Sequence, residues 1–415
     1  MLEYTRGKFM ATIGMIAEFN PFHKGHKYII DKAKSISGAD NVIVVCSGNF
    51  VQRGEPSVYD KTFRTKAALA NGVDAVFELP VYYSTASAEK FARAGVKFLT
   101  DLGCVDYLCF GCEADHIKML PLIANILNSE PVEYQSVLKQ QLADGESFPK
   151  ARSIALQEYL HETKGINRNE VEITMKSPNN ILAIEYIKAI KHFNSNLKPL
   201  AIKRVGADYS SLDIFDEYSS ATAIRNQIKK DKDIRFLVPQ EAFKYYNQTK
   251  PIFMDDFDMI LGNSLIGKNK FDEFLDINSE LANRIQNQAN NYTDIEHFAM
   301  QIDSKNYTKT GISRALLHIM LKIKEADVLE AINNNYFTSA RLLGINRSSN
   351  LIKIINDNSK IPLISKYSKH YENAVGLDKK LLDIQLYADE LYRLIYMIKY
   401  KEIIPNEFER QIVVK

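Results

Sequence analysis

Residues 18–27 read EFNPFHKGHK and directly follow the apolar run ATIGMIA at residues 11–17. The apolar run predicts a first strand, and the stretch after it predicts a turn into a helix. The chain has eight histidines, and two of them, His23 and His26, stand on either side of Gly25 in this turn. In a parallel sheet the ligand crevice lies at the carboxyl ends of the strands, where the next helix presents its positive N-terminus. The position of the turn therefore predicts an anion site.

The first half of the chain alternates short apolar runs with amphipathic segments. The predicted strands are Thr12 to Phe19, Asn41 to Cys46, Ala75 to Leu79, Tyr107 to Phe110 and Leu200 to Arg204. The predicted helices are His26 to Ser37, Asp60 to Asn71, Ser87 to Leu102 and Ile181 to His192. Strands separated by helices of this length form βαβ crossovers. The sequence thus predicts the α/β class, with a Rossmann-like parallel sheet.

The pattern changes near residue 230. Segments such as RALLHIMLKI (residues 314–323) have helical spacing, and strand signals are limited to short runs near Leu363 and Val413. We predict two domains: an α/β domain over residues 1–230 and a mostly α-helical domain over residues 231–415.

Composition narrows the class of protein. The chain has 415 residues, of which 46% are hydrophobic and 25% charged, as in ordinary globular proteins. It contains no apolar run near the ~20 residues that span a bilayer, and its first residues lack the apolar core of a signal peptide. We therefore predict a cytoplasmic protein with no membrane partner. A net charge of +2 excludes a globally basic nucleic-acid binder but allows a local basic patch.

Cys109 and Cys112 form a CxxC pair in YLCFGCE. A zinc site needs a second pair of ligands at matching spacing, and the sequence offers none, so we predict that these thiols pack in the core. No metal site made by the protein alone is predicted.

The histidine turn carries the first candidate chemistry. Pro21 would stop the strand and Gly25 would let a phosphate approach the backbone. The two imidazoles could then donate hydrogen bonds to the α-phosphate of a nucleotide, where negative charge grows as pyrophosphate leaves. The alternative is that His23 and His26 only cap the helix or fill the core. Residues 23–26, HKGH, match the HxGH signature of the nucleotidyltransferase and class I synthetase superfamily. This chain resembles that superfamily in having the motif directly after a first strand.

A second turn supports the first. SSATAIR (residues 219–225) resembles the Ser/Thr-rich turn that the same superfamily has near the end of its sheet. Ser220 or Thr222 could cap a helix whose free N–H groups face the β- and γ-phosphates, and Arg225 could neutralise these phosphates. Taken alone, the stretch is merely a good helix start.

Further stretches identify a family. SGNFVQRGEPSVYDKTFRTKAALANGVDAVFELP, YLCFGCE, SPNNILAIEYIKAI, IKRVGADY and TGISRALLHIMLKI together closely resemble the bacterial tRNA(Met) cytidine acetate ligases. The resemblance implies an enzyme that converts ATP and acetate to acetyl-adenylate and pyrophosphate without acetyl-CoA. It implies transfer of the acetyl group to N4 of the wobble cytidine in the anticodon loop of elongator tRNA(Met). Residues 1–230 would be the ATP-binding catalytic domain and residues 231–415 the tRNA-binding domain.

The resemblance also implies site residues. His23, His26 and Arg225 would be catalytic. ATP would contact Ala17, Glu18, Phe19, Asn20, Pro21, Phe22, His23, Lys24, Gly25, His26, Gly111, Asn179, Lys203, Arg204, Ser220 and Thr222, with Mg²⁺ on its phosphates. Asn179 could instead be a plain helix cap. Lys203 and Arg204 adjoin on a strand and face opposite sides, so we expect one of them in the crevice and favour Arg204 for its planar guanidinium.

Candidate contacts to acetate or RNA follow from position. Asn49, Gln52 and Arg53 lie just past the second strand, and Lys61 and Arg64 could form a basic edge on the next helix; solvated surface residues are the alternative. Lys309 and Arg314, with His318, Arg341 and Arg347, could contact RNA, and Tyr307 and Phe337 could stack on bases. Taken singly, each is better explained as a structural or solvated residue, and the cluster matters more than any member. The sequence carries no signal for an oligomeric state.

Acetate is already ionised at pH 7, so the first step needs alignment and charge neutralisation rather than a base. The cytosine amine must lose a proton in the second step, and the sequence does not identify the acceptor. Two rival functions remain at this point. A small-molecule adenylyltransferase explains the α/β half but leaves the C-terminal half without a task, and a catalytically silent RNA-binding protein does not explain the intact His23, His26 and Arg225.

Overall fold

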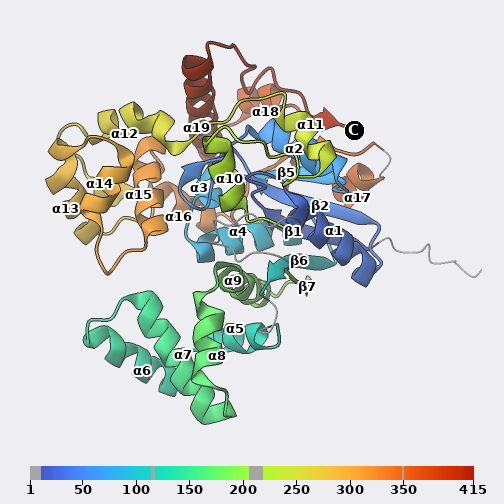
Figure 1. Ribbon diagram of the computed structural model, residues 1–415. Helices are drawn as coiled ribbons and strands as arrows, with labels where there is room; N and C mark the ends of the chain where they lie inside the picture. The colour runs from blue at the N-terminus through green and yellow to red at the C-terminus, as the bar shows by residue number, and fades with distance from the viewer. Residues whose placement is uncertain (1–10, 114–116, 205–217, 348–349) are drawn as a thin grey trace, which may run out of the picture.

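The computed structural model describes residues 11–113, 117–204, 218–347 and 350–415, and its centre is a twisted sheet (Figure 1). The strand order is β10-β8-β5-β2-β1-β6-β7, with β9 paired to β8. The parallel strands are β1 (Thr12–Ala17), β2 (Asn41–Ser47), β5 (Ala75–Leu79), β6 (Tyr107–Cys112) and β7 (Lys198–Lys203). All five predicted strands are present. β1 pairs with β2 on one side and β6 on the other, so the strand order reverses beside β1, where such folds bind ligands.

Helices cover both faces of this sheet. They are α1 (Lys24–Ser37), α2 (Lys61–Ala70), α3 (Val81–Ser84), α4 (Ala88–Asp101), α9 (Pro178–His192) and α10 (Ala221–Lys229). A small antiparallel hairpin, β3 (Phe50–Val51) and β4 (Glu55–Pro56), follows β2. The four helices predicted in this half are confirmed as α1, α2, α4 and α9. Cys109 and Cys112 are buried free thiols, as the core-packing prediction required.

Four helices between β6 and α9 form a lobe that stands apart from the sheet (Figure 1). They are α5 (Met119–Ser129), α6 (Val132–Ala143), α7 (Phe148–Lys164) and α8 (Arg168–Lys176). The sequence analysis did not predict them. Two of them have narrow apolar stripes: α6 fully buries one side chain, Tyr134, and half of the buried residues of α7 are alanines.

The second half is mostly helical, as predicted. Its helices are α11 (Gln240–Tyr246), α12 (Asp258–Leu265), α13 (Ser279–Gln288), α14 (Ile295–Ile302), α15 (Lys309–Leu321), α16 (Glu325–Asn333), α17 (Leu351–Asn358), α18 (Tyr367–Asn373) and α19 (Gly376–Tyr400). Short 3-10 turns are η2 (Met254–Phe257), η3 (Phe271–Glu273) and η4 (Ala289–Asn291). None of the helices in the described ranges is long and apolar enough to cross a membrane.

Three strands of the second half extend the sheet of the first. β8 (Ala340–Ile345) pairs antiparallel with β5, while β9 (Leu363–Ile364) and β10 (Val413–Val414) pair with β8. The short runs predicted near residues 363 and 413 are thus confirmed, whereas β8 was not predicted. Buried residues of both halves form one continuous core cluster. The second half therefore completes the sheet, and the division of roles at residue 230 stays a prediction.

Candidate active site

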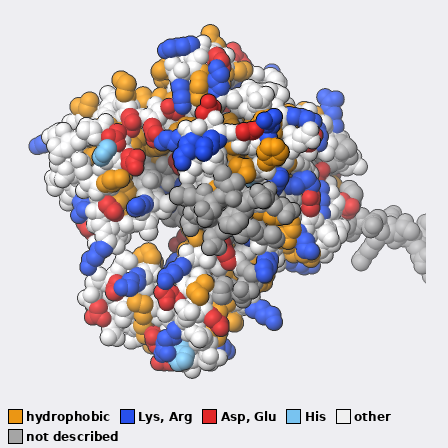
Figure 2. Space-filling view, viewed as in Figure 1, with side chains coloured by type: hydrophobic (Ala, Val, Ile, Leu, Met, Phe, Trp, Pro, Cys, Tyr) orange, Lys and Arg blue, Asp and Glu red, His pale blue; other side chains and the backbone are white. Residues whose placement is uncertain are grey.

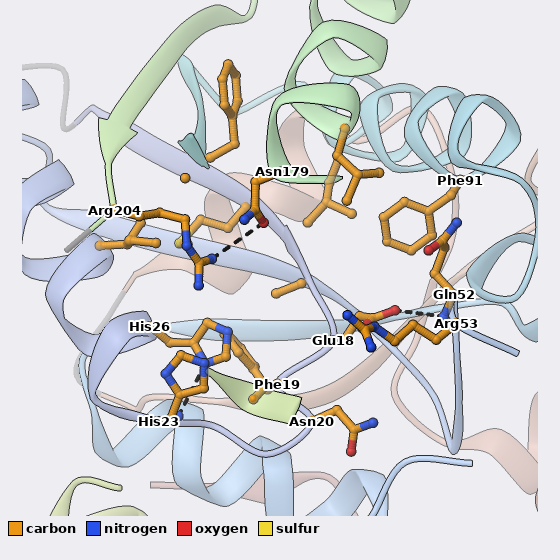
Figure 3. A pocket seen from close by; sticks show the side chains of 18 of the residues that line it. Glu18, Phe19, Asn20, His23, His26, Gln52, Arg53, Phe91, Asn179 and Arg204 are labelled. Atoms are coloured by element: carbon orange, nitrogen blue, oxygen red, sulfur yellow. Dashed lines mark hydrogen bonds between the residues drawn. The ribbon is translucent and has the colours of Figure 1, made fainter. Parts of the chain in front are cut away.

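A cavity opens beside the carboxyl ends of β1 and β6, bordered by the starts of α1, α9 and α10 (Figure 3). The predicted residues that line it are Ala17, Glu18, Phe19, Asn20, His23, His26, Gln52, Arg53, Gly111, Asn179, Arg204, Thr222 and Arg225. Residues more than 200 positions apart in the chain therefore meet here. The sequence analysis missed most of the apolar wall, which includes Ile16, Phe91, Phe110, Leu182 and Tyr186. The pattern of α4 and α9 showed that these helices bury one face, but not which of their residues border a cavity.

The two histidines are locked at the start of α1. His23 is the N-cap residue, and its Nδ1 accepts a hydrogen bond from the Gly25 N–H at 3.1 Å. The Nδ1 of His26 accepts one from the His23 N–H at 3.2 Å, and the ring centroids lie 3.8 Å apart. Because both Nδ1 atoms accept from backbone donors, the proton of each neutral ring is on Nε2. The capping role and the functional role, taken as alternatives from the sequence, are thus compatible.

Both rings are neutral at pH 7. Burial, with a contribution from Arg204, lowers the pKa of His26 to about 3. Burial also lowers the pKa of His23, and His26, Arg204 and Arg225 lower it further. Each ring therefore offers an Nε2–H donor without a charge of its own, and neither is a useful proton acceptor near neutral pH.

Gly25 also serves the packing of the histidine turn. A Cβ at this position would lie 2.9 Å from Cε1 of His23, so the missing side chain makes room for the His23 ring, and the predicted approach of a phosphate to this backbone stays a prediction. We expect Gly25→Ala to displace that ring and to lower the rate of pyrophosphate exchange about 10- to 100-fold, because small misplacements of catalytic groups are costly. Exchange assays with unchanged circular dichroism would check this, and a wild-type rate in the variant would contradict it. Pro21, Phe22 and Lys24 complete the turn but do not line the cavity.

Arg204 faces the cavity from the end of β7, and Lys203 is exposed outside it, as the alternation predicted. The Asn179 Nδ2 donates to Glu113 at 2.8 Å. Its Oδ1 accepts from Arg204 at 3.5 Å (Figure 3). Asn179 is therefore not a plain cap. A Cβ on Gly111 would lie 3.1 Å from Cγ of Arg204, so the absence of a side chain at this glycine leaves room for the arginine side chain.

The SSATAIR turn forms the start of α10. Ser220 is its N-cap, and its hydroxyl accepts from the Ala223 N–H at 3.0 Å. Arg225 donates to the Asn20 carbonyl at 2.9 Å and pairs with Glu55 at 3.2 Å. It thereby joins α10 to the histidine turn and to the β3–β4 hairpin, on the same cavity as Arg204.

Glu18, Gln52 and Arg53 form the far end of the cavity, next to Phe91 (Figure 3). A Glu18 carboxylate oxygen accepts from the Gln52 backbone N–H at 2.7 Å. Burial raises the pKa of Glu18, while the Gln52 N–H and the guanidinium groups of Arg53 and Arg225 offset part of that rise.

The predicted basic edge on α2 is wrong. Lys61 is 2% exposed and pairs with Glu78, Asp389 and Glu407 at 2.8, 2.7 and 3.0 Å. Arg64 is fully buried and donates to backbone carbonyls, including that of Glu18.

Asn49 also fails as a substrate contact. It is 2% exposed, accepts from the Lys61 N–H at 2.9 Å and donates to Asp389 at 3.0 Å. Ion pairing and hydrogen bonding satisfy these polar groups inside the protein, so they reach neither ATP nor RNA.

Lys61 belongs to a buried ionic cluster that joins the two halves. The cluster comprises the cations Lys61, Arg341 and Arg410 and the carboxylates Asp60, Glu78, Asp389 and Glu407. Burial, together with the charges of Glu407 and Glu78, raises the pKa of Asp389 to about 7. The cations Lys61 and Arg341 act in the opposite direction and lower it. Burial acts upward on Glu407 too, but Lys61, Arg341 and Arg410 outweigh it and lower the pKa of that residue.

The raised pKa of Asp389 predicts a pH effect on stability. The folded state holds this proton more tightly than the unfolded chain does. The proton's contribution to the unfolding free energy is therefore complete below about pH 4 and is lost as the pH rises through about 7. We expect Asp389→Asn to flatten the decline in unfolding free energy between about pH 5 and pH 7.5. Urea titrations of both proteins across this range would measure it. Parallel curves for the variant and the wild type would contradict the assignment.

The predicted RNA contacts divide in two. His318 and Phe337 are buried, and Arg341 lies in the ionic cluster, so these three predictions are wrong. Lys309 is exposed at the start of α15, and Arg347 is exposed after β8.

Arg314 and Tyr307 are neither fully buried nor fully exposed. Arg314 is mostly buried, and its backbone abuts Gly54 between β3 and β4. Tyr307 is half-buried and donates to Asn278 at 2.7 Å.

Comparison with known proteins agrees with this geometry. Residues 10–406 match the family model of the HIGH nucleotidyl transferases. The tRNA(Met) cytidine acetate ligase of Acetivibrio thermocellus is 37% identical over 98% of this chain and 100% of its own, and that of Thermoanaerobacter sp. (strain X514) is 37% identical over 93% and 96%. The crystal structure of Thermotoga maritima TmcAL in its apo form superposes with a TM-score of 0.91 at 30% identity, covering 98% of this chain and 99% of that one. The form bound with alpha-thio ATP superposes with a TM-score of 0.88. This chain belongs to the tRNA(Met) cytidine acetate ligase family.

Proposed function

We propose that this enzyme activates acetate with ATP and transfers the acetyl group to N4 of the wobble cytidine of elongator tRNA(Met), giving N4-acetylcytidine. The observation that carries the proposal is the cavity beside β1, where two neutral imidazoles and the arginines 53, 204 and 225 converge. A relative with the same fold binds an ATP analogue, and several relatives are named as acetate ligases of this tRNA.

In the first step, an acetate oxygen attacks the α-phosphorus, and the bond from that phosphorus to the bridging oxygen of pyrophosphate breaks. The Nε2–H groups of His23 and His26 donate to the α-phosphate oxygens as negative charge grows there. Arg204 and Arg225 neutralise phosphate charge from either side, and the N-terminus of α10 adds its partial positive charge. A neutral imidazole whose proton is on Nε2 can fill this role, because that N–H is a hydrogen-bond donor.

Mg²⁺ would arrive with ATP rather than occupy a site of its own. Glu18 is the single carboxylate among the described residues that line the cavity, and no cluster of three or more metal-ligating side chains occurs in the described ranges. Bound to the phosphates, the ion would supply charge neutralisation. The other charged residues that line the cavity, Arg53, Arg204 and Arg225, are cationic, which fits an anionic nucleotide.

In the second step, the wobble cytosine must leave the anticodon loop and enter the cavity. Lys309 and Arg347 remain the exposed cations of the predicted RNA contacts. α15, which begins at Lys309, touches Gly54 through its backbone, next to Arg53 in the cavity wall. We propose that residues 231–415 bind the tRNA and that α15 lies between the RNA and the cavity.

Radiolabelled acetate tests the function. With ATP and tRNA(Met), label should enter the RNA, and omitting ATP or acetate should abolish it; replacing acetate by acetyl-CoA should not support the reaction. ATP turnover with a phosphorylated small molecule and no RNA labelling would indicate an adenylyltransferase. RNA binding without any ATP turnover would indicate a silent binding protein.

A further inference from the structure

The acyl transfer step needs a proton acceptor, and the cavity offers few. The histidine pair is at one end and Glu18, Gln52 and Arg53 are at the other (Figure 3). His23 and His26 each hold a proton on Nε2 and use Nδ1 for a backbone hydrogen bond, so neither has a free basic nitrogen facing the substrate. Arginines 53, 204 and 225 are permanently protonated. The histidines therefore serve as donors, and another group must take the proton.

Cys109 is the cavity's thiol, and burial raises its pKa to about 12. It is protonated at neutral pH and has no base function there. Glu18, by contrast, is the single carboxylate among the described lining residues. Of the described acidic and basic side chains that line the cavity, it is the one that can accept a proton at neutral pH.

The surroundings of Glu18 hold it in place as an acceptor. One carboxylate oxygen is fixed by the Gln52 N–H at 2.7 Å, while the side chain as a whole is partly open to the cavity. The charged groups that act on it are Arg53 and Glu55 from the β3–β4 hairpin and Arg225 from α10. The two arginines favour the ionised form, whereas burial makes the carboxylate more basic than one in water. Glu18 also follows β1 directly, so it lies at the carboxyl end of the same strand that leads into the histidine turn.

We propose that the Glu18 carboxylate accepts the proton that the cytosine N4 amine loses when it attacks the acetyl carbonyl of the acetyl-adenylate. This assignment rests on the proposed function. A bond forms from N4 to the carbonyl carbon, and the bond from that carbon to the AMP phosphate oxygen breaks. The electron pair of the broken bond leaves with AMP, and the N4 proton passes to Glu18 and then to water. The exocyclic amine of cytosine is a weak nucleophile, so removing its proton during attack assists the reaction.

The test separates the two steps in one variant. Glu18→Gln keeps the side-chain size and an oxygen that can accept from the Gln52 N–H, but cannot take a proton. We expect acetate-dependent exchange of labelled pyrophosphate into ATP to fall much less than acetyl transfer does in the same variant. Single-turnover acetyl transfer to tRNA(Met) should fall about 10²- to 10⁴-fold, the usual contribution of a general base. Glu18→Asp should recover part of the transfer. The matched control is Glu241→Gln, which removes an exposed carboxylate on α11.

The pH profile of transfer provides a second readout. The wild-type rate should fall toward acid as the carboxylate protonates, and Glu18→Gln should lack this acid limb. Equal losses in exchange and transfer would overturn the proposal and assign Glu18 to binding or positioning; undiminished transfer would overturn it outright. If Glu18→Gln fails to bind ATP, Glu18→Asp decides: its acid limb of transfer should shift relative to the wild type, and an unshifted limb contradicts a base at this position. A wild type without acetate-dependent exchange would instead overturn the proposed function itself.

Discussion

His26→Asn should strongly slow adenylate formation while leaving the fold intact. The asparagine Oδ1 can take the place of the imidazole Nδ1 and accept from the His23 N–H, so α1 keeps its cap. The side chain no longer reaches to where Nε2–H stood, so the α-phosphate loses one donor. Removing one such donor typically costs about 10²- to 10³-fold in rate. Acetate-dependent pyrophosphate exchange would measure the loss.

His26→Gln is the reciprocal control. Its amide N–H₂ group reaches about as far as Nε2, but the side chain cannot cap the helix in the same way. We expect this variant to retain more activity than His26→Asn and to lose about 1 kcal/mol of stability. If both variants lose activity and stability together, the histidine acts through the structure of the turn, and the donor role assigned to it is wrong.

Lys61→Met should destabilise the fold strongly. The lysine ammonium contacts three carboxylates, and both it and Glu407 are 2% exposed. Methionine fills a similar volume but leaves these carboxylates with the two arginines of the cluster. Breaking a buried ion pair from one side costs about 3–5 kcal/mol, because the remaining charges are left uncompensated. Urea unfolding at neutral pH would show this as a lower midpoint.

Lys66→Met on the same helix provides the control. Lys66 is half-buried over the Phe63 ring, 5.0 Å from its centroid, and it forms no ion pair among the described residues. We expect a change within about 0.5 kcal/mol there. A Lys61→Met variant as stable as Lys66→Met would show that the cluster contributes no net stability across the two halves.

The sequence predicted the parallel sheet because its strands are short apolar runs with clear boundaries. Ala75–Leu79 has the predicted bounds, and all five residues are buried. β8, with the sequence ARLLGI, was missed because it stands in a region of helical patterns and adds to the sheet by pairing with a strand more than 260 positions earlier. The local periodicity of a sequence does not reveal that two strands so far apart along the chain pair with each other.

The candidate site was predicted well where residues lie in the turns that follow strands. His23, Gly111 and Arg204 line the cavity because the carboxyl ends of parallel strands meet at one edge of the sheet. Lys61 was misjudged for the opposite reason. A lysine on an amphipathic helix usually faces solvent, and its partners Asp389 and Glu407 lie over 300 positions away in sequence. Burial of a charge depends on such distant partners, so a local pattern cannot reveal it.

Mass spectrometry of the tRNA product is the decisive test of the proposed reaction. The purified enzyme would be incubated with ATP, ¹³C-labelled acetate and tRNA(Met), and the RNA would then be digested and mapped. We predict one ¹³C-acetyl group on N4 of the wobble cytidine, formed together with AMP and pyrophosphate. It should be absent when ATP is omitted and should form far more slowly when His26 is replaced by asparagine. Acetyl-adenylate accumulating with unmodified tRNA(Met), or modification that requires acetyl-CoA instead of acetate, would contradict the proposed function.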